Sequence, residues 1–161
     1  YLKADSKSVE IVSGGDGKRL SSPAVVRRGG KTFVVYVSGD EGRSVMKALE
    51  FNGLNPMVSK SWKNVFFKDA WGKKTDVLMG SGSAVHKKLS LYGPKAVNVF
   101  LPPGSNEQWF VYQGWSTPSP TDKAKGLMTL MQQFDFGDDG SLIRQAGPMF
   151  NIYLLQPTVK K

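Results

Sequence analysis

Residues 17–39 read GKRLSSPAVVRRGGKTFVVYVSG and predict a β-hairpin. Two runs within this stretch, 24–28 and 31–39, are rich in β-branched and aromatic residues, which favour strands. Gly29-Gly30 separates the runs, and a Gly-Gly pair suits the positive φ angles of a two-residue hairpin turn. Pro23 stands at the entrance of the hairpin, directly after two serines. The stretch therefore predicts antiparallel β-structure.

The rest of the chain repeats this pattern of short strand-like runs, at 9–13, 44–51, 64–69, 76–84, 96–103, 108–115, 126–136 and 149–157. Turn-forming residues separate the runs, as in GDDG at 137–140, and no long amphipathic helix is evident. The stretch 116–125 is expected to be an exposed loop, because its prolines do not fit a central strand. Regular antiparallel hairpins are typical of a sandwich, a barrel or a propeller. No change in composition divides the chain, so we expect residues 1–161 to form a single all-β unit.

The composition excludes several classes of protein. The chain of 161 residues has a net charge of +9, but its basic residues are spread over successive turns and match no RNA- or DNA-binding motif. We interpret them mainly as solvated turns, with an acidic protein or glycan partner as the alternative. No apolar stretch approaches the length of a membrane span, and the absence of cysteine excludes disulfides and thiol chemistry.

Residues that could carry catalysis are sparse. His86 is the only histidine and stands beside two lysines, so we interpret it as an exposed loop residue. A metal site needs several converging ligands, and we therefore predict no metal and no cofactor. Glycoside cleavage needs two carboxyl groups across the bond, yet most of the 13 acidic residues lie in or beside turns. Glu41 and Glu107 are the two glutamates to test.

Aromatic residues give a stronger signal, because aromatic faces stack on the apolar faces of sugar rings. The sequence places six of them at strand ends and loops: Trp62, Trp71, Trp109, Trp115, Tyr92 and Tyr112. Trp62 and Trp109 are interpreted as packing between sheets. Trp115, beside the 116–125 loop, is the residue that we most readily assign to a ligand surface.

Five segments resemble, in order, the landmarks of glycoside hydrolase family 43, and above all its exo-acting α-L-arabinofuranosidases. They are SSPAVVRRGGKTFVVYVSG (21–39), NGLNPMVSKSWKN (52–64), YGPKAVNVF (92–100), WFVYQGW (109–115) and LMQQFDFGDDGSLIRQAGP (130–148). The family folds as a five-bladed β-propeller and processes arabinan and xylan. The resemblance implies that this chain is the C-terminal part of such a propeller, about two to three blades.

The chain departs from the family at the positions that carry its chemistry. The family's general acid, the glutamate of E-G-P, falls on Ser21, and the glycine of that motif falls on Ser22. The histidine of Y-G-P-G-H falls at Ala96 or the next residue, and the histidine of V-Y-H-A falls on Gln113. The arginine before A-Q falls on Leu130. A serine hydroxyl does not donate a proton near neutral pH, so the resemblance implies a degenerate catalytic centre.

The resemblance also implies that the catalytic base and the remaining blades lie outside this segment. An open propeller would expose long strand edges, so we expect a second chain, or a second copy of this one, to complete the ring. It further makes a secreted protein the expectation.

The function predicted first is that of a non-catalytic pseudoenzyme, a glycan-binding or protein-interaction scaffold. Its binding groove would use Ser21, Ser22, Tyr92, Gln113 and Trp115. One alternative is an active family 43-type glycosidase, of the α-L-arabinofuranosidase or xylosidase kind, whose carboxylates lie in a partner chain. A second alternative is an unrelated β-sandwich that serves as a structural subunit.

Overall fold

The computed structural model describes residues 8–14, 18–68, 71–83, 90–117, 126–144 and 153–154. These residues form strands β1 (Leu20–Arg28), β2 (Lys31–Ser38), β3 (Val45–Phe51), β4 (Trp62–Asn64), β5 (Phe67–Lys68), β6 (Lys74–Thr75), β7 (Val77–Met79), β8 (Gly82–Ser83), β9 (Ser90–Phe100), β10 (Trp109–Trp115), β11 (Leu127–Gln133) and β12 (Tyr153–Leu154). A short 3₁₀ turn, η1 (Ser59–Ser61), precedes β4. The described residues contain no helix with the length and hydrophobicity that a membrane crossing requires.

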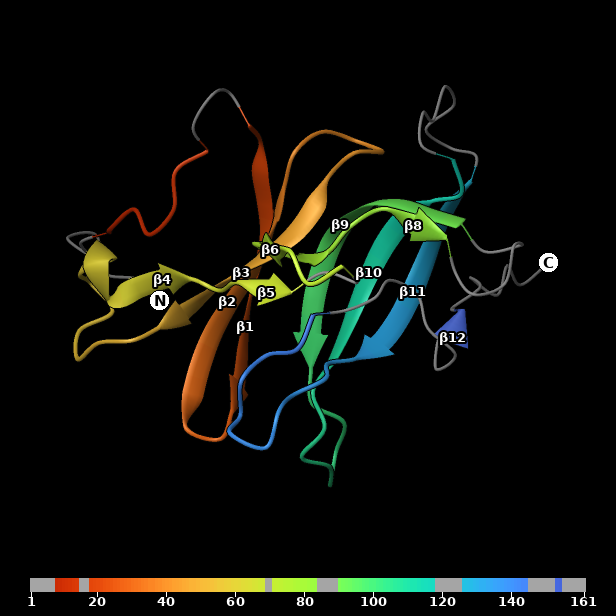
Figure 1. Cartoon of the computed structure of the whole chain (residues 1–161). Helices are drawn as coiled ribbons and strands as arrows, with labels where there is room; N and C mark the ends of the chain where they lie inside the picture. The colour runs from red at the N-terminus through yellow and green to blue at the C-terminus, as the bar shows by residue number, and fades with distance from the viewer. Residues whose placement is uncertain are drawn as a thin grey trace.

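The strands form two antiparallel sheets that lie side by side (Figure 1). The first sheet has the order β1-β2-β3-β4, with β7 also paired to β3, and the second has the order β12-β11-β10-β9-β8. The short hairpin β5-β6 lies between them in Figure 1. Neighbouring strands in both sheets are mostly consecutive along the chain, as in a meander. The predicted all-β class with antiparallel hairpins is confirmed.

A single hydrophobic core joins the two sheets. The first sheet contributes Phe33 and Val35, which alternate along β2 with less buried residues, and the second contributes Phe110, Tyr112 and Leu130. Side chains two apart in a strand point to the same face, so this spacing directs one face of each sheet into the core. The rings of Phe110 and Tyr112 are stacked, with their centroids 5.0 Å apart.

One polar group enters this core with a partner. The Tyr112 hydroxyl donates a hydrogen bond to Oε1 of Gln132 at 3.3 Å, and both side chains are buried. Burial raises the pKa of Tyr112, so the phenol stays neutral and keeps its donor.

The two sheets come into backbone contact where β9 passes the turn between β2 and β3. Gly93 has a φ of +56°, and a Cβ added there would lie 2.6 Å from backbone atoms of Gly42. Beside this contact, the buried Ser44 hydroxyl donates a hydrogen bond to the Pro94 carbonyl at 2.8 Å. We call this contact between the 39–44 turn and the start of β9 the seam.

A second contact joins the sheets at their other end. Gly29 of the β1-β2 turn lies against Gly140, and an added Cβ on Gly29 would come within 3.2 Å of the Gly140 Cα. The neighbouring Asp139 accepts a hydrogen bond from the backbone amide of Ser141 and an ion-pair contact from Lys31 at 3.4 Å. The hydrogen bonds of Ser141 lower the pKa of Asp139 to about 2, with a smaller contribution from Lys31.

Several predicted strands differ from the observed ones. Residues 9–13 form no strand and belong to neither sheet. The run 64–69 divides, because the Val65 amide donates to Ala48 while Phe67–Lys68 turn away to pair with β6. β9 begins earlier than predicted and ends at Phe100, and β11 ends at Gln133.

Other predictions fall outside the described residues. They concern His86, most of the 116–125 loop, and all of the 149–157 strand except β12.

The seam predicts how two glycine substitutions will differ. Gly93→Ala should destabilise the protein by about 2 to 4 kcal/mol, because the new Cβ meets the Gly42 backbone in a left-handed conformation. Gly104→Ala is the matched control: its φ is +74° and nothing lies within 4 Å of the added Cβ, so about 1 to 2 kcal/mol is expected. Thermal and urea unfolding of both variants measure the difference. Equal destabilisation would show that the seam is not tightly packed.

Candidate ligand-binding site

A pocket of about 530 Å³ opens beside the seam. It is formed by the start of β1, the end of β2 with the turn that follows, and the middle of β9 and β10. Its lining residues are Arg19, Ser21, Ser22, Val37, Gly39, Asp40, Glu41, Ser44, Lys95, Ala96 and Gln113. The pocket therefore draws side chains from both sheets.

This pocket brings together positions that the sequence singled out separately. Ser21, Ser22, Ala96 and Gln113 lie far apart along the chain and all line it. The fifth position, Leu130, does not: it is fully buried and belongs to the shared core. The resemblance placed a polar site group, or the glycine beside one, at each of these five positions. Four of the five thus line the same pocket.

Irregular backbone aims these residues into the pocket. In β1 the pairing register with β2 shifts between Ser21 and Ala24, and the β9-β10 register shifts on both sides of Gln113. Such bulges redirect side chains and are common beside functional sites. Each strand contributes to the pocket at its irregular segment.

Two pocket residues also have a strained conformation. Ser22 has a φ of 54° and Ala96 a φ of 51°, and they are the only residues other than glycine with positive φ among those described. This region costs an L-residue about 1 to 3 kcal/mol and concentrates at functional sites. Ser22 stands where the resembled family has glycine, the residue that adopts this conformation most readily.

The prediction that Trp115 belongs to a ligand surface is wrong. Trp115 is fully buried, and its indole N–H has no hydrogen-bond partner among the described residues. Its ring instead contacts a residue that lines the pocket: the Lys95 ammonium lies 4.5 Å from the ring centroid. Tyr92 pairs with Trp115 across the strands and is half-buried, but it does not line the pocket.

Trp62 and Trp109 do not pack between the sheets as predicted, whereas Trp71 lies in a turn, as its sequence context indicates. Trp62 is half-buried on β4, next to Phe51, with ring centroids 5.1 Å apart. Trp109 is half-buried and donates its indole N–H to Glu107 at 3.1 Å. Neither belongs to the core between the sheets, because each lies on the face of its strand that points away from it. Trp71 is 90% exposed.

Charged residues complete the pocket and were not predicted as a group. Arg19 and Lys95 supply two positive charges, and Asp40 and Glu41 supply two negative ones. Both carboxylates are exposed on the turn after β2. Among these four residues the sequence singled out Glu41, as a glutamate to test, but not Lys95, because only the β9-β10 pairing shows that Lys95 faces Gln113.

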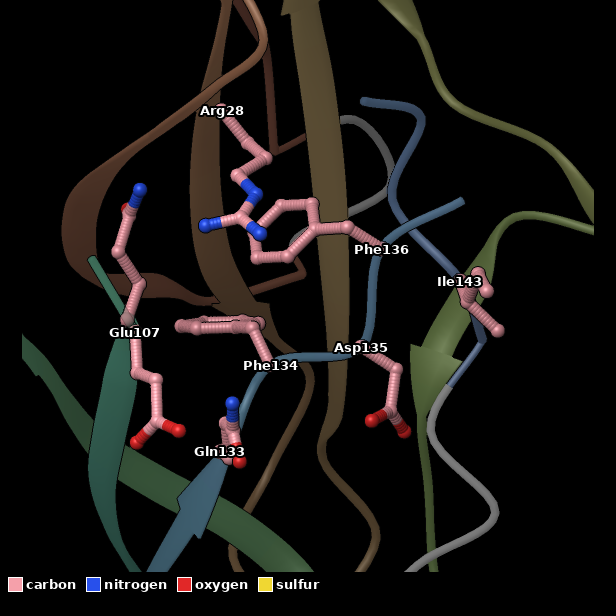
Figure 2. Close-up of a pocket in the computed structure, with 8 residues that line it drawn as sticks. Arg28, Glu107, Gln133, Phe134, Asp135, Phe136 and Ile143 are labelled. Carbon is pink, nitrogen blue, oxygen red and sulfur yellow. The ribbon is translucent and has the colours of Figure 1, made fainter. Parts of the chain in front are cut away.

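A second cavity, of about 470 Å³, lies toward the end of the sheets where Gly29 meets Gly140. Figure 2 shows the carboxylates of Glu107 and Asp135 on either side of the Gln133 amide, with Phe134 beside them. The Arg28 guanidinium lies over the Phe136 ring, 5.7 Å from its centroid. The sequence showed no pairing of these carboxylates, because the 126–144 segment reaches Glu107 only through the β10-β11 pairing.

The described residues contain no group of three or more His, Cys, Asp or Glu side chains that could hold a metal ion.

Comparison with known proteins identifies the architecture. No protein-family model and no curated protein sequence matches the chain. A solved structure described as a glycoside hydrolase matches with a TM-score of 0.58 and 16% identity, over 97% of this chain and 31% of that one. An endo-1,4-beta-xylanase from Bacteroides thetaiotaomicron matches with a TM-score of 0.54 and 12% identity, over 83% of this chain and 40% of that one.

The chain shares the fold of part of these longer structures, with antiparallel β-sheets arranged as in part of a β-propeller. It spans about a third to two fifths of the length of these two structures. At such low identity the likeness concerns the fold, and function has to be argued from the sites themselves.

Proposed function

We propose that this protein is a non-catalytic, family 43-like propeller module that binds glycans in the seam pocket. The convergence of Ser21, Ser22, Ala96 and Gln113 on one pocket supports this proposal. The resemblance selected these positions from sequence alone, and all four line the same pocket. The strained backbone at two of them supports a functional rather than a purely structural role.

The pocket offers the chemistry that sugar binding needs. Serine hydroxyls both donate and accept hydrogen bonds, and the Gln113 amide does the same through separate atoms. These groups match the hydroxyls of a saccharide. The pocket is also open to solvent along the 39–44 turn, where the exposed acidic residues lie, so an extended chain has room to enter.

Catalysis is disfavoured by the surroundings of the acidic residues in this pocket. A glycosidase needs one carboxyl group that stays protonated near neutral pH, which takes an apolar, desolvated environment. Asp40 and Glu41 are both exposed and share the pocket with Arg19 and Lys95. Ser21 stands at the position that the resemblance gives to the acid.

Hydrolysis is the second candidate, and two observations favour it. Glu41 lines the seam pocket, and Glu107 shares the second cavity with Asp135. Two carboxyl groups facing one cavity are the minimum that glycoside cleavage requires. Carboxylates supplied by the rest of a propeller would serve the same end.

A paired assay decides between binding and cleavage. Arabinan- and xylan-derived oligosaccharides are titrated calorimetrically, and their hydrolysis is followed over long incubations. We expect micromolar to millimolar binding, typical of small open sites, that Gln113→Ala weakens about 5- to 20-fold, and no cleavage. Gln133→Ala, in the second cavity, is the matched control and should leave binding unchanged. Cleavage that Glu41→Gln or Glu107→Gln abolishes would overturn the non-catalytic proposal.

We further propose that the remaining blades are supplied from outside residues 1–161, by a second chain or a second copy. The matched structures are two to three times longer than this chain. An incomplete propeller leaves strand edges and apolar side chains uncovered; Val25 and Leu101, for example, are 53% and 58% exposed.

Native mass spectrometry of the protein purified from its source tests this assembly. We expect a particle heavier than the 17.7 kDa of this chain, containing either a second polypeptide or more than one copy. A stable 17.7 kDa monomer would contradict the proposal.

A further inference from the structure

Lys95 occupies a special place in the seam pocket. It lies on β9 directly opposite Gln113 of β10, and both residues line the pocket. Side chains of directly paired residues project from the same face of a sheet. Lys95 therefore enters the pocket from the strand position that faces Gln113, the residue whose amide the proposed glycan site uses.

The Lys95 ammonium packs against an aromatic ring. It lies 4.5 Å from the centroid of the Trp115 ring, and that ring is fully buried. A cation over an aromatic face is attracted by the electron-rich ring. This contact with a buried ring favours a Lys95 conformation at the pocket wall.

Lys95 makes no ion pair with any described residue. The two lysine ion pairs that occur there are Lys31 with Asp139 and Lys47 with Asp76. Lys95 is half-buried, and a partly desolvated charge without a counter-ion is unfavourable. Two carboxylates, Asp40 and Glu41, also line the pocket, but on the exposed turn after β2 and beyond ion-pair distance of Lys95. Arg19 adds a second cation to the pocket.

We propose that the seam pocket selects an acidic saccharide, a glycan bearing uronic acid, and that Lys95 pairs with its carboxylate. The inference rests on the proposed glycan-binding function and names its ligand class. A neutral sugar would desolvate the ammonium further and leave it unpaired. A carboxylate gives it a charge-assisted hydrogen bond, about twice as strong as a neutral one. The net charge of +9 also attracts polyanionic chains from a distance.

The test compares two ligands that differ only in the carboxylate. Oligogalacturonate and the α-1,4-linked galacto-oligosaccharide of the same length are titrated into the whole chain by calorimetry at low and at physiological salt. We expect the acidic ligand to bind about 10- to 100-fold more tightly, as a charged hydrogen bond allows, with a preference that salt weakens. This wild-type comparison needs no variant to fold.

Substitutions of Lys95 then test whether this residue causes the preference for the acidic ligand. Lys95→Gln should remove it, whereas Lys95→Arg should keep most of it, since the charge remains. Lys63→Gln is the matched control: Lys63 is an exposed lysine on β4 outside the pocket, and its loss lowers the net charge equally.

The outcomes separate the two proposals. Equal binding of both ligands, or an acidic preference that Lys95→Gln leaves intact, would overturn the assignment of Lys95 while glycan binding stands. If Lys63→Gln lost as much of the acidic preference as Lys95→Gln, the assignment of Lys95 would also be overturned, because the preference would then depend on net charge alone. Binding of neither these ligands nor arabinan and xylan fragments would overturn glycan binding itself.

Discussion

The close approach of Gly93 to Gly42 is the constraint on which the rest of the structure depends. A Cβ at Gly93 would collide with the Gly42 backbone, and Gly42 itself has a φ of 77°, so both positions favour glycine. The contact fixes β9 against the turn after β2, and the hydrogen bond from Ser44 to Pro94 holds it there. The shared core joins the same two sheets, and in it aromatic side chains of the second sheet pack against aliphatic ones of the first.

The seam pocket is a consequence of this contact. Because the turn and β9 cross at a glycine pair, the residues just beyond the crossing, Ala96 on one side and Ser21 and Ser22 on the other, face a common hollow. The regular pairing of strands breaks at the same places, which leaves polar side chains aimed inward and two residues in a strained conformation. Solved structures that share this fold are described as a glycoside hydrolase and an endo-1,4-beta-xylanase, and the position to which the resemblance assigns the acid, Ser21, lines this pocket.

The sequence predicted local structure well where turn chemistry is decisive. Gly29 and Gly30 both have positive φ, as a two-residue hairpin demands. The sequence failed as a guide where strand pairing over long distances decides whether a residue is buried. The place of Trp115 beside a loop suggested an exposed side chain, but the strand that carries it continues into the core. Lys95 was missed for a related reason: its partner Gln113 is 18 positions away, and only the sheet register shows that they are neighbours. Single motifs could name Ser21 and Gln113, but the charges around them depend on the fold.

The most direct measurement of the central claim is a backbone NMR titration of the chain with a bound oligosaccharide. We expect amide shifts to change first and most at the pocket residues, while the amides around Glu107 and Asp135 stay unchanged. The pocket residues concerned are Ser21, Ser22, Lys95, Ala96 and Gln113. Shifts confined to the second cavity, or none at saturating ligand, would contradict the claim that the seam pocket is the glycan-binding site.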